Sequence, residues 1–492
     1  MLNSLRISEL KKDRAQDTAP ALHDLELTAL ADLIATRAVS PVEATCRTLQ
    51  RVTALDDRLG SYVQVIGETA RADAAAAEAE IRAGHYRGPL HGIPIAVKDM
   101  FAIKGLATGA GMTVHAGRRA SENSTVVARL KAAGAVIIGT LQMTEGAYSD
   151  HHPAVTPPKN PWNAAYWPGI SSSGPAVAVA AGLSFGTIAS DTGGSIRWPC
   201  AATGLTGLKP SWGRVSRHGA FALAPTLDHV GPIARSAADA ALLLAAIAGP
   251  DPADPTARQA PLAPAPARPP QSLAGVRLGI DPAWNSIGVD PVVQDVVGEA
   301  LAVFRALGAS VTEIVFPDVG DAVADWSPLC AVEAALAHAP TYPRQAADYG
   351  PVLAAVIEAG HAVSGTALHA IELRRRAFAG RAAALHGAID LILTPVHPFA
   401  PLSLATIRSL GAQPDLIAAL QRYTCPFNMT GQPTVRLPGG FSADGLPIAF
   451  QLVGPDLGEG QLLEAAMAFQ AVTDWHRRRP PLATPPDRSC AQ

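Results

Sequence analysis

Apolar residues near the N-terminus recur at intervals of three and four positions, which predicts helices between Leu25 and Ala83. The predicted helices are LTALADLIATR, PVEATCRTLQRVTALDD and ETARADAAAAEAEIRAG, and the second begins with Pro41 after Ser40. We expect these helices to pack alongside the body of the protein and not to form a site. We divide the chain into an N-terminal helical segment at residues 1–75 and a larger domain at residues 76–480.

Between Pro89 and Gly207 the pattern changes to short apolar runs that end in Gly, Ser or Pro. Two of these runs are IPIAV (93–97) and AVIIG (135–139), and helical stretches such as STVVARLKAAG flank them. Strands that alternate with helices in this way are typical of an α/β fold with a largely buried sheet.

Residues 249–271 are crowded with Pro and Ala and have no periodicity, which predicts an extended surface linker inside the larger domain. After the linker, four apolar runs predict strands, and a terminal helix ending near His476 follows them. These runs are VRLGI (276–280), ASVTEIVF (309–316), LILTP (391–395) and LPIAFQLVG (446–454). We therefore expect one sheet to which segments on both sides of the linker contribute.

The composition excludes several classes of protein. Of 492 residues, 48% are hydrophobic and 16% are charged, so the chain can bury a large core and is not disordered as a whole. With 39 Lys and Arg against 42 Asp and Glu and no basic patch, the chain lacks the positive field that a nucleic-acid partner requires.

The cysteines and the N-terminus favour a cytoplasmic protein. The five cysteines are scattered and form no CxxC pair, which argues against a disulfide framework or a zinc ribbon and favours a reducing compartment. The first residues lack the apolar stretch of a signal peptide, and the chain has no run of 18 apolar residues. We expect no membrane association.

Lys98 is the first candidate for chemistry, because it closes the apolar strand GIPIAV. Burial disfavours the ammonium form and lowers the pKa of a lysine, so a buried Lys98 can act as a base near neutral pH. The alternative is a lysine at the end of a strand that reaches solvent beside Asp99.

Two loops rich in Gly and Ser are the next candidates. In PGISSSGPAVAVAAG (168–182), three serines precede an apolar helix, where each serine could also be a simple helix cap. In SFGTIASDTGGSIRWP (184–199), Gly193 and Gly194 come directly before Ser195, and paired glycines allow backbone N–H groups to point at one oxyanion. The alternative for this second loop is an ordinary glycine turn.

Other catalytic motifs are missing. The sequence around Ser195 is GGSIR and not GxSxG, and neither HExxH nor GxxxxGK[ST] occurs. His151 and His152 have no carboxylate or third histidine at ligand spacing, so we expect no metal site there. Cys200 could be a nitrile-attacking nucleophile, but no partner that would lower its pKa is evident, and we interpret it as a small buried residue.

The segments GIPIAVKD, PGISSSGPAVAVAAG and DTGGSIRWPC, in this order, resemble the three signature blocks of the amidase signature family of serine hydrolases. The resemblance covers most of the chain from about Leu25 onward. It implies one α/β/α sandwich around a large, mixed, twisted β-sheet.

The resemblance also implies roles for individual residues. Lys98 corresponds to the catalytic lysine, Ser171 to the bridging serine that follows a cis peptide bond, and Ser195 to the nucleophile. Ser171 and Ser195 are 24 residues apart, as in the family. The backbone amides implied for the oxyanion hole are those of Thr192, Gly193, Gly194 and Ser195. The implied supporting residues are Ser172, Asp191 and Arg197.

Two features depart from the common family pattern. Ile170 and Pro175 stand where many members have a glycine and a small residue, so the geometry at Ser171 is the least secure part of the comparison. The segment AYSDHHPAVTPPKNPW also differs, and loops near a site usually set the choice of substrate. We hypothesise that His151 and His152 line or approach the pocket entrance.

The function implied is amide hydrolysis, in which a small carboxamide or carbamate (urethane) is cleaved at its C–N bond through an acyl-enzyme on Ser195. The amide hydrolysis that the family resemblance implies requires neither a metal nor an organic cofactor. Homodimers are frequent among the family's members and are one option here. One alternative is the glutaminase-type subunit of a tRNA-amidating amidotransferase complex, which would co-purify with partners. Another is a non-catalytic binding relative, against which the joint presence of Lys98, Ser171 and Ser195 argues.

Overall fold

The computed structural model describes residues 21–262, 266 and 268–482. Their strands form one mixed sheet of eleven strands in the order β1-β3-β2-β4-β6-β5-β10-β11-β9-β7-β8. Strand β2 pairs in parallel with β3 and β4, and β7 pairs in parallel with β8 and β9, whereas the other pairs are antiparallel. Strands from both sides of the linker meet where β5 pairs with β10, so the prediction of one shared sheet is confirmed.

The strand bounds agree with the apolar runs to within a few residues. The strands are β1 (Tyr62–Val65), β2 (Pro94–Lys98), β3 (Val136–Leu141), β4 (Gly186–Asp191), β5 (Thr206–Lys209), β6 (His229–Ala234), β7 (Arg277–Ile280), β8 (Ser310–Glu313), β9 (Leu391–Pro395), β10 (Thr434–Phe441) and β11 (Pro447–Val453). Every residue of β2, β3 and β4 is buried, as expected for central strands covered on both faces.

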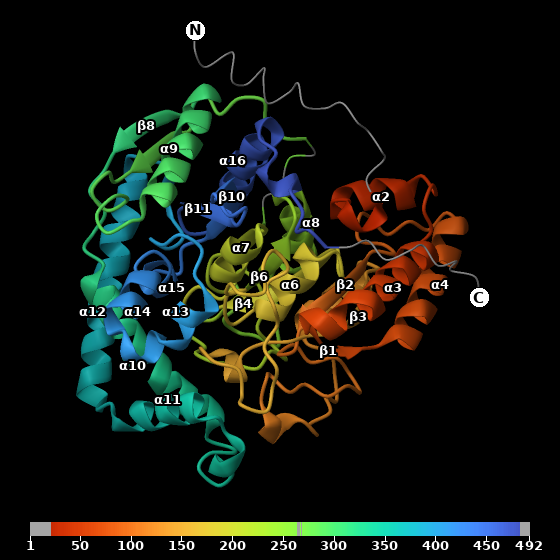
Figure 1. Ribbon diagram of the computed structural model, residues 1–492, viewed down its shortest axis with the longest axis horizontal. Helices are drawn as coiled ribbons and strands as arrows, with labels where there is room; N and C mark the ends of the chain where they lie inside the picture. The colour runs from red at the N-terminus through yellow and green to blue at the C-terminus, as the bar shows by residue number, and fades with distance from the viewer. Residues whose placement is uncertain (1–20, 263–265, 267, 483–492) are drawn as a thin grey trace.

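Helices cover the sheet and form the outer layers (Figure 1). Helices α6 (Ser173–Ala180) and α7 (Arg197–Thr203) pack against each other and against the central strands. The other helices are α5 (Thr125–Ala132), α8 (Ala237–Ile247), α9 (Pro291–Ala306), α10 (Gly320–His338), α11 (Pro351–Ala362), α12 (Gly365–Ala384), α13 (Leu404–Arg408), α14 (Pro414–Gln421), α15 (Cys425–Met429) and α16 (Glu459–Val472). This architecture agrees with the α/β/α sandwich around a large mixed sheet that the resemblance implies.

The N-terminal segment forms the three expected helices, α2 (Leu27–Ala35), α3 (Pro41–Leu59) and α4 (Gly67–Arg82). Helix α3 begins as predicted, because the Ser40 side chain accepts a hydrogen bond from the Glu43 N–H and Pro41 occupies the first turn. The segment also contributes strand β1, which pairs with β3 and which the helical pattern did not reveal. The division at residues 75 and 76 falls inside α4 and stays a prediction.

The Pro-rich segment after α8 is only partly the extended surface linker that was expected. Asp251 and Asp254 are both buried, each with 8% of its surface exposed. Asp251 accepts hydrogen bonds from Thr125 and Ser216, which fixes this stretch to the body of the protein. Ala257 is buried as well, so both polar and apolar contacts hold this part of the segment. Residues 263–265 and 267 lie outside the described residues.

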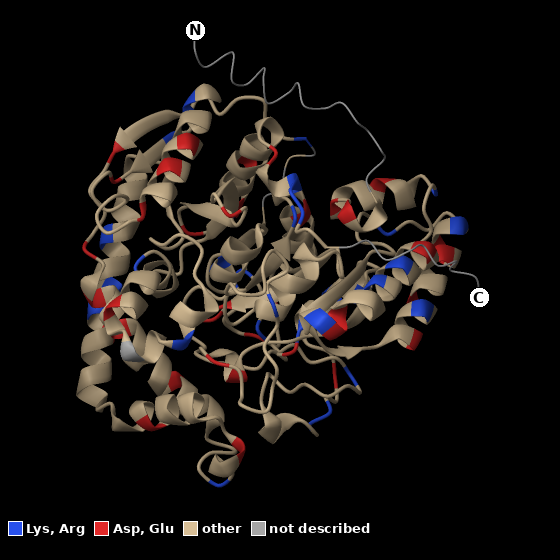
Figure 2. Cartoon of the chain, in the orientation of Figure 1, with Lys and Arg blue, Asp and Glu red and all other residues tan. Residues whose placement is uncertain are grey.

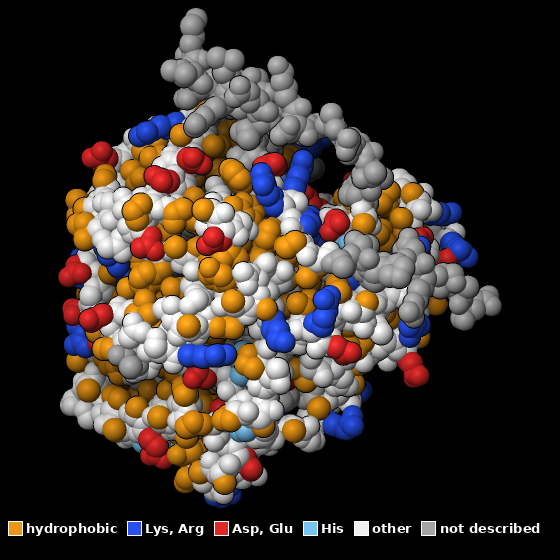
Figure 3. Space-filling model, in the orientation of Figure 1, with side chains coloured by type: hydrophobic (Ala, Val, Ile, Leu, Met, Phe, Trp, Pro, Cys, Tyr) orange, Lys and Arg blue, Asp and Glu red, His pale blue; other side chains and the backbone are white. Residues whose placement is uncertain are grey.

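Charged side chains of both signs are interspersed along the chain and are scattered over the face shown in the space-filling view (Figures 2 and 3). In the described part of the chain, no single helix is long and apolar enough to cross a membrane. One helix pair, Pro351–Ala362 with Gly365–Gly387, passes that test jointly by length and composition, but it is bent by 98°.

Candidate active site

Lys98 is the last residue of β2, and its side chain is completely buried. Because β2 and β4 are parallel neighbours, their carboxyl ends meet at the same edge of the sheet. The Lys98 Nζ atom lies 2.7 Å from Ser171 Oγ and 2.9 Å from Ser190 Oγ. Burial lowers the pKa of Lys98 to about 7, although Asp228 and Asp191 act in the opposite direction. A lysine that reaches solvent beside Asp99 is therefore not what the structure shows.

Ser171 lies in the loop before α6, where the preceding Ile170–Ser171 peptide bond is cis, as the resemblance implies. Ser171, Ser172 and Ser173 are all fully buried, so they are not simple solvent-facing helix caps. The Ser172 hydroxyl donates to the backbone carbonyl of Ser190 at 3.2 Å and so ties this loop to the end of β4. The structure thus accommodates the β-branched Ile170 at this position.

Ser195 lies between β4 and α7 and keeps 8% of its surface exposed. The two glycines before it are required by close packing. A Cβ atom on Gly193 would lie 2.6 Å from the Trp326 ring, and one on Gly194, whose φ is +142°, would lie 2.6 Å from the Trp198 ring. These positions therefore tolerate only glycine, and an ordinary exposed turn would not impose that restriction.

The backbone N–H groups around Ser195 divide into two sets. The amides of Thr192, Gly193 and Ser195 donate to no other described residue, which leaves them available to an oxyanion. The Gly194 amide, which the resemblance also assigns to the oxyanion hole, donates instead to Asp191 Oδ1 at 2.9 Å. The glycine loop (residues 191–195) therefore offers fewer free backbone N–H donors to an oxyanion than the resemblance implies.

Asp191 and Arg197 form a fully buried ion pair beneath this loop. The Arg197 guanidinium binds both carboxylate oxygens, with Nη2–Oδ1 and Nε–Oδ2 distances of 2.8 and 3.0 Å. Burial alone would raise the pKa of Asp191, but the adjacent Arg197 outweighs burial and holds that pKa below its ordinary value. A permanently charged carboxylate here fixes the Gly194 and Ile196 amides.

Several residues of this region were missed by sequence reasoning. Asp228, just before β6, accepts a hydrogen bond from the Thr192 hydroxyl at 2.6 Å, and burial raises the pKa of its carboxyl to about 6. Asp228 and Ser190 both line a cavity of 210 Å³. Trp326 of α10 and Asn428 of α15 donate hydrogen bonds to the backbone of the glycine loop. No local motif marks Trp326 and Asn428, since their partners in the loop are more than 100 residues away in sequence.

The two histidines occupy different surroundings. His151 Nε2 lies 3.2 Å from Ser173 Oγ, so His151 does approach the serine loop, and burial lowers its pKa to about 4. His152 Nε2 lies 3.5 Å from Thr113 Oγ1. Within the described residues, no group of three or more His, Cys, Asp or Glu side chains is arranged to hold a metal ion.

The cysteines also have distinct environments. Cys200 is fully buried in α7, and burial raises the pKa of its thiol to about 12, so the thiolate that a nucleophile requires is disfavoured. Cys330 and Cys425 are likewise free and buried. Cys46 is disulfide-bonded, whereas the three free cysteines agree with the prediction that disulfides do not form the framework of the fold. Cys490 lies outside the described residues.

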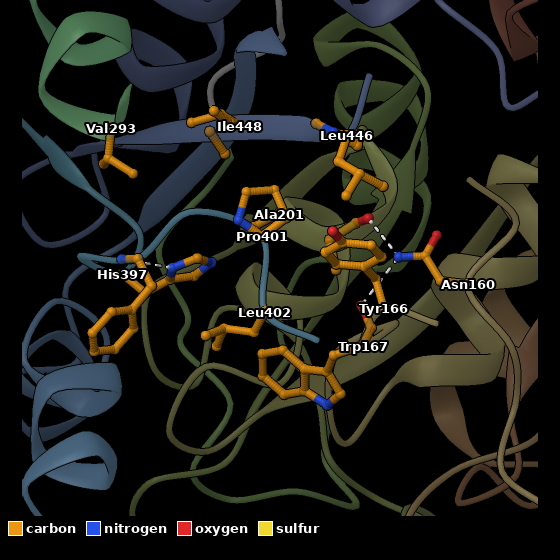
Figure 4. A pocket seen from close by; sticks show the side chains of 14 residues that line it. Asn160, Tyr166, Trp167, Ala201, Val293, His397, Pro401, Leu402, Leu446 and Ile448 are labelled. Carbon is orange, nitrogen blue, oxygen red and sulfur yellow. Dashed lines mark hydrogen bonds between the residues drawn. The ribbon is translucent and has the colours of Figure 1, made fainter. Parts of the chain in front are cut away.

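A recess is lined by side chains that include Tyr166, Leu402 and Ile448 (Figure 4). Its lining includes Trp167, Ala201 and His397. The rings of Trp167 and Trp198 are 6.2 Å apart, and Trp198 in turn lies against Gly194. Trp198 therefore lies between Trp167, which lines the recess, and Gly194 of the loop before Ser195.

A mixed sheet of this size, with a buried lysine, a serine after a cis bond and a serine in a glycine loop at one edge, defines the class of amidase signature enzymes. The family model described as Amidase matches residues 43–463, and the chain belongs to that family. It is accordingly an enzyme of the amidase family, for which general amide hydrolysis is supported.

Individual relatives agree with this assignment. The chain is 45% identical over 469 residues to a Mycobacterium tuberculosis protein named "Putative amidase AmiD", with 94% of this chain and 97% of that protein covered. It is 34% identical over 493 residues to a glutamyl-tRNA(Gln) amidotransferase subunit of Geobacter sp., with 94% and 100% covered. A solved structure of a bacterial aryl acylamidase of the amidase signature family superposes with a TM-score of 0.83 at 26% identity, covering 92% of this chain and 97% of that one.

Proposed function

We propose that this protein is an amidohydrolase that cleaves the C–N bond of small carboxamides or carbamates through an acyl-enzyme on Ser195. The observation that carries the proposal is the buried Lys98 side chain, whose pKa is lowered to about 7 and whose Nζ atom lies 2.7 Å from Ser171 Oγ. A base with a pKa near the operating pH is the most effective one for proton transfer.

The reaction proceeds in two halves. In the first, neutral Lys98 takes the proton of Ser171, Ser171 takes that of Ser195, and Ser195 Oγ bonds to the carbonyl carbon. The amides of Thr192, Gly193 and Ser195 stabilise the oxyanion. The proton then returns through Ser171 to the leaving nitrogen as the C–N bond breaks. In the second half, water attacks the acyl-enzyme by the same relay, and the acid leaves with Ser195 restored.

Aromatic side chains border the two glycines that precede Ser195. Tyr148 and Trp326 stack with their ring centroids 6.5 Å apart and their planes 10° from parallel. The Trp326 ring borders Gly193, and the Trp198 ring borders Gly194. The likeness to a bacterial aryl acylamidase supports aryl amides as a substrate class to test.

We propose further that the enzyme works as a homodimer in the cytoplasm, without a metal or organic cofactor and without a nucleic-acid or membrane partner. Light scattering coupled to size-exclusion chromatography tests the dimer, since a dimer has twice the 50.8 kDa mass of the chain.

A second candidate function is that of the glutaminase-type subunit of a tRNA-amidating complex. The identity of 34% to a glutamyl-tRNA(Gln) amidotransferase subunit, over nearly the whole of both chains, favours it. This function predicts ammonia release from glutamine and co-purification with partner subunits. The first candidate predicts turnover of simple amides by the isolated chain.

The test is amine or ammonia release by the purified protein from aryl amides, aliphatic amides, ethyl carbamate and glutamine. Ser195→Ala is measured in parallel, and Ser272→Ala, on an exposed position, is the matched control. Turnover that disappears only in Ser195→Ala supports the proposal and ranks the substrate classes. Turnover that persists in Ser195→Ala overturns it.

A further inference from the structure

The glycine loop, defined here as residues 191–195, has four successive backbone carbonyls that each accept a hydrogen bond. The Asp191 carbonyl accepts from Asn428 Nδ2 at 3.0 Å, and the Thr192 carbonyl accepts from Trp326 Nε1 at 2.8 Å. The remaining two acceptors are the Gly193 carbonyl, bound by Cys425 Sγ at 3.5 Å, and the Gly194 carbonyl, bound by the Trp198 N–H at 2.8 Å.

These bonds determine where the N–H groups of the loop point. In a planar trans peptide the C=O and N–H groups point in opposite directions, so fixing a carbonyl also fixes the amide of the next residue. The Asn428 bond therefore orients the Thr192 N–H, and the Trp326 bond orients the Gly193 N–H. Both of these amides donate to no other described residue and face away from the side chains that hold the carbonyls.

We propose that Trp326 is a positioning residue of the oxyanion hole, with Asn428 acting in the same way on the neighbouring Asp191–Thr192 peptide. This inference rests on the proposed function, in which the Gly193 amide stabilises the oxyanion. Trp326 comes from α10, 134 residues away in sequence, and is 6% exposed. Its indole N–H is the side-chain donor that aligns the Thr192–Gly193 peptide for the transition state.

The glycine at position 193 is part of the same arrangement. A Cβ atom there would lie 2.6 Å from Trp326 Cζ2 and 2.9 Å from Cε2, so the absence of a side chain lets the indole approach the peptide. Tyr148 stacks on the same indole and restricts its rotation. The loop and the indole are therefore packed as one rigid unit.

Trp326→Phe removes the N–H donor and keeps an aromatic ring against Tyr148 and Gly193. Trp284→Phe is the matched control, because Trp284 is 7% exposed, is also stacked on an aromatic ring, and its Nε1 atom is bonded to no described residue. Both variants of the full chain are treated with a fluorophosphonate, which phosphonylates an activated serine and releases fluoride. The rate constant kinact and the inhibition constant KI are measured separately, and the labelled residue is identified by mass spectrometry.

We expect Trp326→Phe to lower kinact by about tenfold with little change in KI, since removal of a direct oxyanion donor costs about 10²–10³-fold and this residue acts through one. Trp284→Phe is expected to label at the wild-type rate. A Trp326→Phe rate equal to that of Trp284→Phe, with Ser195 labelled in both, overturns the positioning role and leaves the proposed function intact. Labelling of wild-type protein at a residue other than Ser195 overturns both.

A second variant covers the case in which Trp326→Phe does not fold, which circular dichroism and the melting temperature reveal. Asn428→Leu removes the amide donor to the Asp191 carbonyl, and Asn428→Gln keeps an amide donor. Slower labelling in Asn428→Leu that Asn428→Gln restores supports the positioning of the loop by these side chains. Equal rates in the two variants count against it.

Discussion

Replacing Lys98 by methionine separates the cost of burying this lysine from its use in catalysis. Methionine has a similar length and volume but cannot be charged. Burial lowers the pKa of Lys98 from the ordinary 10.5 to about 7, and this difference corresponds to about 5 kcal/mol of free energy. At pH 7 most of this burial cost lowers the free energy of unfolding of the wild-type protein. Lys98→Met has no such cost.

The sign of the pH dependence follows from proton binding. Between pH 7 and pH 10.5 the unfolded chain holds the Lys98 proton and the folded chain does not. The free energy of unfolding of the wild-type protein therefore rises by about 1.4 kcal/mol per pH unit in this window from this group alone. Lys98→Met loses the bonds to Ser171 and Ser190, at about 1–2 kcal/mol in total. We expect Lys98→Met to be inactive, about 3 kcal/mol more stable than wild type at pH 7, and to lose this advantage by about pH 10.

Urea unfolding followed by tryptophan fluorescence at pH 7, 8 and 9 measures this difference, with Lys104→Met on an exposed position as control. The same lysine sets the activity profile, so kcat/KM of the wild type should rise with a midpoint near pH 7. Free energies of wild type and Lys98→Met that stay parallel from pH 7 to 9 would refute the assignment of a buried, neutral Lys98.

Four further substitutions test the rest of the site. Ser171→Ala interrupts the proton relay and should lower kcat by about 10³-fold with little change in KM, measured by steady-state kinetics. Arg197→Met leaves the Asp191 carboxylate buried without its partner and should cost about 3–5 kcal/mol in urea unfolding. Gly194→Ala forces a Cβ atom to 2.6 Å from Trp198, at a φ of +142°, and should cost about 1–3 kcal/mol and most of the activity. Cys200→Ala should keep the kcat of the wild type. Loss of activity in Cys200→Ala, with activity retained in Ser195→Ala, would support the Cys200 thiol as the nucleophile.

The parts of the fold that the sequence revealed are those with strong local patterns. The apolar runs at β2, β3, β7, β8, β9 and β11 predicted strands that the structure contains, although β8 is largely exposed. Strand β1 stands between two predicted helices, and β6 and β10 contain Pro232 and Pro438, so their strand patterns are weak.

In the candidate site, too, the residues that could be predicted are those that stand in a recognisable local motif. The three signature blocks are distinctive sequence motifs, and they contain Lys98, Ser171 and Ser195. The structure brings Lys98 and Ser171 into hydrogen-bond contact. Trp326, Asn428 and Asp228 reach the site only through tertiary packing, and a single sequence carries no local sign of that. The Gly194 amide illustrates the same limit, because its bond to Asp191 depends on how Arg197 orients that carboxylate.

The two halves of the chain meet in the sheet where β5 pairs with β10, so the order of synthesis on the ribosome affects when the site can form. All three signature blocks have left the ribosome once residue 200 has emerged, yet the side chains that hold the glycine loop belong to α10 and α15. The nascent chain therefore carries every signature residue long before its loop can acquire its final shape. A fragment that stops before Cys425 would contain the whole signature and still be inactive, so catalytic competence arrives only with the last strands of the sheet.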